Sequence, residues 1–72
     1  MPHETREQAE NEAKKLGIPI SQVVKSDKGY FIAPQGIKTQ SAKNAYASCR
    51  ADGKGKEYCS KVAWTIENQI KG

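Results

Sequence analysis

Residues 40–70, QSAKNAYASCRADGKGKEYCSKVAWTIENQI, decide the fold because they hold two helix-favouring segments joined by a short turn that contains two glycines. Thr39 or Ser41 suits the N-cap of a helix over about residues 40–51, and Gly53 suits its end. A second helix follows over about residues 56–70. Since only residues 52–55 join them, we expect the two helices to pack antiparallel as a helical hairpin.

Apolar residues recur at helical spacing in both segments and predict which faces meet. The stripe predicted for the first of these helices is Ala42, Ala45, Tyr46 and Cys49, with Lys43, Ala47 and Arg50 beside it. The broad face predicted for the second is Tyr58, Cys59, Val62, Ala63, Ile66 and Ile70. Trp64 projects from the opposite side of this helix.

Upstream of the helical hairpin, the sequence predicts one more helix and two strands. Thr5 and Gln8 fit a capping box for a helix over residues 5–16, which has Gly17 at its end and an apolar stripe of Ala9, Ala13 and Leu16. Two β-favouring runs, 23–25 and 30–33, flank the turn-forming residues 26–29 and predict a β-hairpin. The expected fold is a small single α+β domain over residues 1–72, in the order α-β-β-α-α, with residues 1–4 frayed.

Composition limits the class of protein. The hydrophobic fraction is 36% and the charged fraction 28%, a globular balance. The aromatic residues predict a core in the C-terminal two thirds, because they are Tyr30, Phe31, Tyr46, Tyr58 and Trp64. No apolar run approaches the ~20 residues of a membrane span, and the N-terminus has no signal-like region. We therefore expect a cytoplasmic protein without membrane contact.

The net charge of +4 is unevenly distributed, with −1 over residues 1–17 and +5 over residues 18–72. A basic surface attracts polyanions, although solubility alone also explains a charge of this size. The candidate nucleic-acid contacts are the basic residues of the helical hairpin and its approach: Lys38, Lys43, Arg50, Lys54, Lys56 and Lys61.

Cys49 closes the first helix of the hairpin and Cys59 opens the second, so antiparallel packing brings them near each other. The leading interpretation is two reduced, buried cysteines that pack as small hydrophobic residues. A disulfide that staples the hairpin is the first alternative. A metal site is the second, but the only further soft ligand is His3 at the frayed N-terminus, so we expect no metal.

No catalytic machinery is visible in the sequence. His3 is the sole histidine, so neither a Cys nucleophile nor a Ser-His-acid triad has a base away from the terminus. The run 53–56, GKGK, lacks the earlier glycine and the Ser or Thr of a phosphate-binding P-loop. A basic turn that leads into a helix N-terminus is still a general anion site. We expect no enzyme activity, no cofactor and no small-molecule substrate.

Residues 13–23, AKKLGIPISQV, resemble a helix-turn-helix DNA-binding motif at three positions, namely Ala13, Gly17 and Val23. The resemblance covers about a quarter of the chain, and its motif has low specificity. It implies that residues 28–32 form a wing and that the residues facing the DNA groove are Ser21, Gln22 and Lys25. Pro19 in the turn and the turn-forming residues 27–29 depart from the motif. These departures favour a helix end that leads into a strand.

Two functions of different classes follow. The first is a non-enzymatic module that binds nucleic acid through the basic surface of the helical hairpin. The second is a protein-binding accessory domain, adaptor or inhibitor, similar to small proteins of phages and mobile elements, with Trp64 as its apolar anchor. For Trp64 itself, burial beneath the first helix or the β-hairpin is the leading interpretation, and an exposed contact role is the alternative. So small a core is often stabilised by a second copy, so a homodimer is compatible with the sequence.

Overall fold

The computed structural model describes residues 4–71 and contains six elements in chain order. They are α1 (Arg6–Leu16), the 3-10 helix η1 (Ile20–Gln22), β1 (Val23–Ser26), β2 (Gly29–Ile32), α2 (Gln40–Ala51) and α3 (Lys56–Lys71). This order confirms the predicted small α+β domain and adds η1, which was not predicted. Of residues 1–4, which were predicted to be frayed, residues 1–3, including His3, lie outside the described residues.

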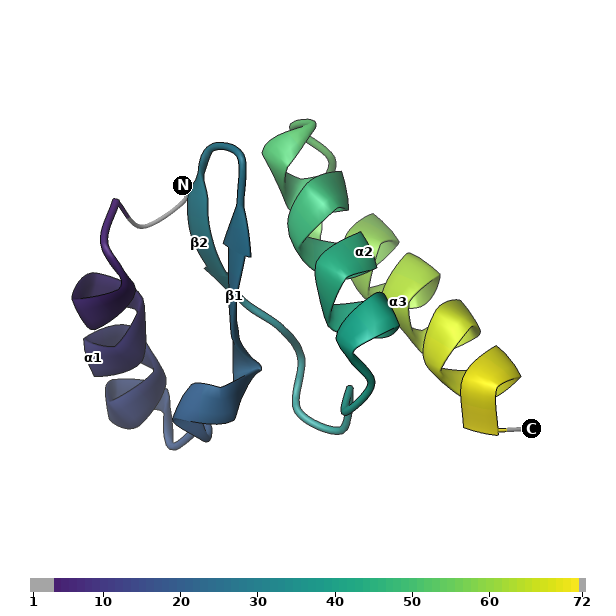
Figure 1. Cartoon of the computed structure of the whole chain (residues 1–72), viewed down its shortest axis with the longest axis horizontal. Helices are drawn as coiled ribbons and strands as arrows, with labels where there is room; N and C mark the ends of the chain where they lie inside the picture. The colour runs from purple at the N-terminus through teal and green to yellow at the C-terminus, as the bar shows by residue number, and fades with distance from the viewer. Residues whose placement is uncertain (1–3, 72) are drawn as a thin grey trace.

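The elements form successive layers (Figure 1), with α1 on one face of the β-hairpin, α2 on the other and α3 outermost. The two strands pair antiparallel, and Val23 lies opposite Ile32 while Val24 lies opposite Phe31. Alternate residues of a strand point to opposite faces, so the first pair packs toward α1 and the second toward α2. The larger core cluster lies between the hairpin and α2–α3, which confirms the expected place of the core.

The ends of α1 follow the predicted sequence signals. The Oγ1 atom of Thr5 accepts a hydrogen bond from Gln8 N at 3.2 Å, and Gln8 Oε1 reaches back to accept from Glu4 N at 3.1 Å. Gly17 ends the helix in the left-handed conformation, with φ of 72°. Leu16, predicted to belong to the apolar stripe, is 59% exposed, because α1 packs on the sheet through the other two residues of the stripe, Ala9 and Ala13.

The helix-turn-helix resemblance is wrong for this chain. Residues 20–22 form a single 3-10 turn and residues 23–26 continue directly as β1, so there is no recognition helix. Gln22 is buried and unavailable to a DNA groove. Its side-chain Nε2 donates to Pro34 O at 2.7 Å and to Ile37 O at 2.8 Å. The alternative, a helix end that leads into a strand, is confirmed.

The α2 helix begins and ends at the predicted residues, and Thr39 rather than Ser41 is its N-cap. Its buried face differs from the prediction, because Ala47 and Ala51 are buried while Ala45 and Cys49 are not fully buried. The reason is that α2 is the middle layer and contacts the β-hairpin on one side and α3 on the other. A single apolar stripe therefore underestimates its buried surface.

The α3 helix shows the opposite error. Its predicted broad face is wrong at both ends, because Tyr58 is 57% exposed and Ile70 is 53% exposed. As the outermost layer, α3 makes substantial contact with only one other helix or strand within residues 4–71, and that element is α2. It therefore buries one narrow ridge. That ridge is Cys59, Ala63 and Glu67, at a spacing of four residues.

Candidate nucleic-acid interface

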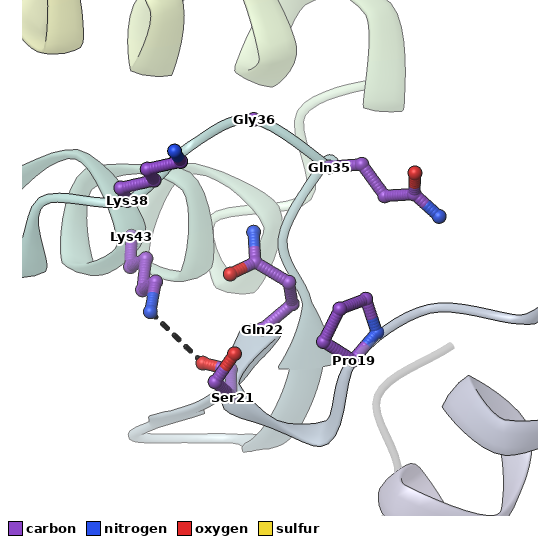
Figure 2. Close-up of a pocket in the computed structure, with 7 residues that line it drawn as sticks. All are labelled: Pro19, Ser21, Gln22, Gln35, Gly36, Lys38 and Lys43. Atoms are coloured by element: carbon purple, nitrogen blue, oxygen red, sulfur yellow. Dashed lines mark hydrogen bonds between the residues drawn. The ribbon is translucent and has the colours of Figure 1, made fainter.

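The structure divides the six predicted basic residues between the two ends of α2. Lys38 and Lys43 lie at its start, where they line a hollow together with Ser21 and Gln35 (Figure 2). Lys43 Nζ donates to the backbone oxygen of Ser21 at 2.9 Å. Lys43 and Arg50 are seven positions apart, which corresponds to about 10 Å along a helix. The predicted residues therefore do not form one compact patch.

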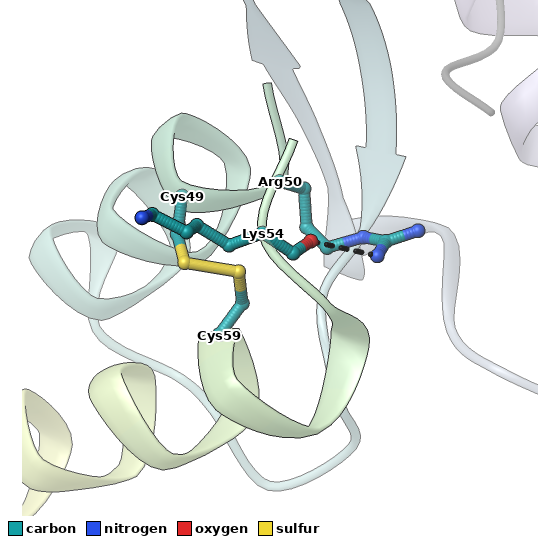
Figure 3. Close-up of a disulfide and its surroundings, with 4 residues drawn as sticks. All are labelled: Cys49, Arg50, Lys54 and Cys59. Atoms are coloured by element: carbon teal, nitrogen blue, oxygen red, sulfur yellow. Dashed lines mark hydrogen bonds between the residues drawn. A yellow bond between two sulfur atoms is a disulfide. The ribbon is translucent and has the colours of Figure 1, made fainter. Parts of the chain in front are cut away.

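A disulfide joins Cys49 to Cys59 at the other end of α2, with their Cα atoms 5.6 Å apart (Figure 3). The prediction that these cysteines lie near each other is confirmed. The leading interpretation, that they are reduced, is wrong, and the first alternative, a disulfide, is the state in the structure. Among residues 4–71, no three or more His, Cys, Asp or Glu side chains lie so that they could hold a metal ion together. The bond fixes the turn between α2 and α3. Lys54 lies in this turn, and the helices that flank it carry Arg50, Lys56 and Lys61.

Arg50 holds this turn against the sheet. Its Nη1 atom donates to Lys54 O at 3.1 Å, and its guanidinium lies 5.8 Å from the centre of the Phe31 ring. Burial raises the pKa of the neighbouring Tyr46, an effect that the positive charge of Arg50 partly offsets. Arg50 is thus half-buried and engaged in contacts within the fold.

The other basic residues near the turn lie on its surface. Figure 3 shows the side chains of Lys54 and Arg50 pointing to opposite sides of the turn. Lys56 and Arg50 line a shallow hollow of about 190 Å³ on the sheet side, and Lys61 lies on the outer surface of α3. Lys54, Lys56 and Lys61 are all exposed.

Tyr58 is the residue of this region that sequence reasoning misplaced. It lies in the first turn of α3, three residues before Lys61, a spacing that puts two side chains side by side on a helix. Its ring is exposed rather than packed in the core. Tyr58 could have been placed correctly only from the order of the layers in the fold, since the outer helix of a stack has fewer neighbours to cover its apolar residues.

Glu67 is the second residue that the sequence did not single out. It is fully buried, and its Oε1 atom accepts from Thr39 Oγ1 at 2.8 Å, from Thr39 N at 3.0 Å and from Lys38 N at 3.2 Å. The carboxylate thus lies at the N-terminus of α2, where the helix dipole favours negative charge. Its burial inside the hairpin also removes an acid from the surface.

The burial of Glu67 leaves the surface of residues 38–72 with fewer negative charges. Residues 1–37 contain five basic and five acidic residues, while residues 38–72 contain seven basic and three acidic ones, so the second part carries the whole net charge of +4. With Glu67 buried, the surface acids of that part are Asp52 and Glu57. The α2–α3 half therefore presents a predominantly positive surface.

Trp64 is 37% exposed and lies neither beneath α1 nor beneath the β-hairpin. Its indole packs on Gly36, where an added β-carbon would lie only 2.6 Å from Trp64 Cη2. Gly36 has a φ of 95° and links β2 to α2. Trp64 thus fixes the loop at the start of α2, a structural contact that leaves part of the ring open to solvent.

No helix among the described residues is long and apolar enough to cross a bilayer. Cys59 is fully buried and forms a disulfide with Cys49. Because disulfides persist in oxidising compartments and are rare in the cytosol, this bond counts against the expected cytoplasmic location. Comparisons of the chain with protein-family models, with curated proteins and with solved structures found no significant match.

Proposed function

We propose that this protein is a non-enzymatic module that binds single-stranded nucleic acid through the tip of its helical hairpin. The hairpin tip is defined here as Arg50, Lys54, Lys56, Tyr58 and Lys61. The observation that supports the proposal most strongly is an exposed aromatic ring beside exposed lysines, on the half of the molecule that has all of the net charge.

The two kinds of side chain have complementary roles in this proposal. Lysine ammonium groups contact phosphates without regard to base sequence, and a base stacks on the exposed face of Tyr58. Stacking of this kind is worth about 1–3 kcal/mol per base. The disulfide holds the two helix ends together, so the tip is ordered before the strand binds and less entropy is lost on association.

The test is fluorescence anisotropy of a labelled single-stranded oligonucleotide titrated with the protein. With about three phosphate contacts, affinity should fall roughly 20-fold between about 50 mM and about 200 mM salt. Reversing the tip charges in the triple variant Lys54→Glu, Lys56→Glu and Lys61→Glu should abolish binding. Replacing Tyr58 by Ala should weaken it about 5-fold to about 160-fold, whereas Tyr58→Phe, which keeps the ring, should bind nearly as well as the original chain.

A matched control distinguishes the effect of the hairpin-tip lysines from the effect of net charge on binding. The triple variant Lys15→Glu, Lys25→Glu and Lys28→Glu changes exposed lysines outside the helical hairpin, and both triple variants lower the net charge from +4 to −2. The proposal requires the control to keep most of the affinity. Equal loss in both triple variants, or no binding at low salt, would refute it and leave the protein-binding alternative as the stronger one.

A further inference from the structure

A hollow of about 460 Å³ lies between η1, the β2–α2 loop and the first turns of α2 (Figure 2). Its lining residues are Pro19, Ser21, Gln22, Gln35, Gly36, Lys38 and Lys43. The volume falls in the range of small-ligand pockets, about 300–1,000 Å³. It lies at the opposite end of α2 from the hairpin tip, so the nucleic-acid proposal does not account for it.

The walls of the hollow are fixed from two sides. The side chain of Gln22 donates to two carbonyl oxygens of the loop, those of Pro34 and Ile37, and Ala33 N donates to Gln22 O at 2.8 Å. On another side, the Trp64 ring packs directly on Gly36. A loop held by these contacts needs little reorganisation to receive a ligand.

The lining is positively charged. Among the described residues that line the hollow, Lys38 and Lys43 are basic and none is acidic. Lys43 Nζ donates to a backbone carbonyl, a neutral partner that leaves the positive charge of the ammonium uncompensated at that contact. Glu67 accepts hydrogen bonds from the backbone N–H groups of Lys38 and Thr39, and its carboxylate is buried between α2 and α3.

We propose that this hollow binds a phosphate monoester of about mononucleotide size. Two ammonium groups suit a dianionic phosphate, and the Ser21 hydroxyl supplies a neutral donor beside Lys43. Lys38 and Lys43 point in different directions in Figure 2, so binding requires their side chains to turn toward the ligand, and Gln35 Nε2 already donates to Gly17 O at 3.5 Å. The same chemistry is offered by a free mononucleotide and by the 5′-phosphate at the end of a strand. The proposal concerns binding and assigns no reaction to the site.

The experiment is a titration of the full-length, isotope-labelled chain, followed by amide chemical shifts in two-dimensional NMR. Adenosine 5′-monophosphate should shift the amides of Ser21, Gln22, Gln35 and Gly36 in a saturable way, and adenosine should not. Lys38→Met and Lys43→Met should each weaken binding by about tenfold or more, since each removes one charged contact. Lys28→Met makes the same chemical change in the β-hairpin turn and should have no effect.

Two further arms complete the design. An oligonucleotide with a 5′-phosphate, compared with the same strand without it, shows whether a strand end occupies the hollow, and the tip triple variant shows whether the hollow works when the hairpin tip does not. Retained mononucleotide binding in that variant would support an independent site. Identical shifts with adenosine and its monophosphate, or full affinity in Lys38→Met with its spectrum otherwise intact, would overturn the proposal.

Discussion

Breaking the Cys49–Cys59 disulfide should remove a large part of the stability of this fold. The bond closes a short loop, with a sequence separation of 10. The loop-entropy relation for a ring of this size gives about 2.7 kcal/mol at 25 °C. A chain of 72 residues has a total stability of roughly 4–11 kcal/mol, so this single bond accounts for a substantial fraction of it.

The assay is urea unfolding followed by far-ultraviolet circular dichroism and by Trp64 fluorescence, with and without a reductant. Reduction should lower the unfolding midpoint by about 2 M urea, given a dependence on urea of about 1.2 kcal/mol per molar for a small domain. The double variant Cys49→Ala, Cys59→Ala should unfold near the midpoint of the reduced chain. It is also the control, because the reductant should not change its midpoint further.

Agreement between the oxidised and reduced curves within about 0.5 kcal/mol would refute the reasoning, since it lies far below the about 2–4 kcal/mol that a disulfide typically contributes. Alkylation of free thiols in intact cells, followed by a gel-mobility measurement, gives the state of the bond in its native compartment. Oxidised chains should resist alkylation, and complete alkylation would show that Cys49 and Cys59 are reduced in that compartment.

Three further perturbations test individual contacts. Gly36→Ala should cost about 2–4 kcal/mol in urea unfolding, because the new methyl group meets Trp64 and the φ of 95° strains any other residue; adding Trp64→Leu should relieve the steric part only. Glu67→Ala should cost about 3–5 kcal/mol and Glu67→Gln about 1–2 kcal/mol, since the amide oxygen still accepts at the start of α2; equal costs would contradict the capping role. The pKa of Tyr46 is raised in the folded state, so its contribution to stability is complete below pH 10.0 and is lost as the pH rises through the folded pKa. Tyr46→Phe should abolish this alkaline loss and remove the corresponding tyrosinate absorbance change; an unchanged pH dependence would count against burial of the hydroxyl.

Much of the fold follows from local signals in the sequence. The bounds of α2 and the end of α1 at Gly17 were predictable because caps and glycines act within a few residues of themselves. The proximity of Cys49 and Cys59 followed from the short turn between two helices. Their bond did not follow, because the choice between a thiol pair and a disulfide depends on the redox environment as well as on distance.

The candidate site was less predictable, because it depends on which helix is covered by which neighbour. Apolar periodicity assigned Tyr58 to the core, but the outer position of α3 leaves that ring exposed. The same periodicity gave no hint of Glu67, whose burial requires donors from residues about 28 positions earlier in the chain. Long-range contacts of this kind also assembled the hollow at the start of α2, through Gln22 and Trp64.

The central claim is that nucleic acid binds at the hairpin tip, and residue-level mapping tests it most directly. Amide chemical shifts of the labelled chain should be recorded during titration with a single-stranded oligonucleotide that lacks a terminal phosphate. The account predicts saturable shifts that concentrate in residues 50–61, with little change in α1. Shifts concentrated in α1 or the β-hairpin, or a spectrum unaltered at low salt, would contradict it.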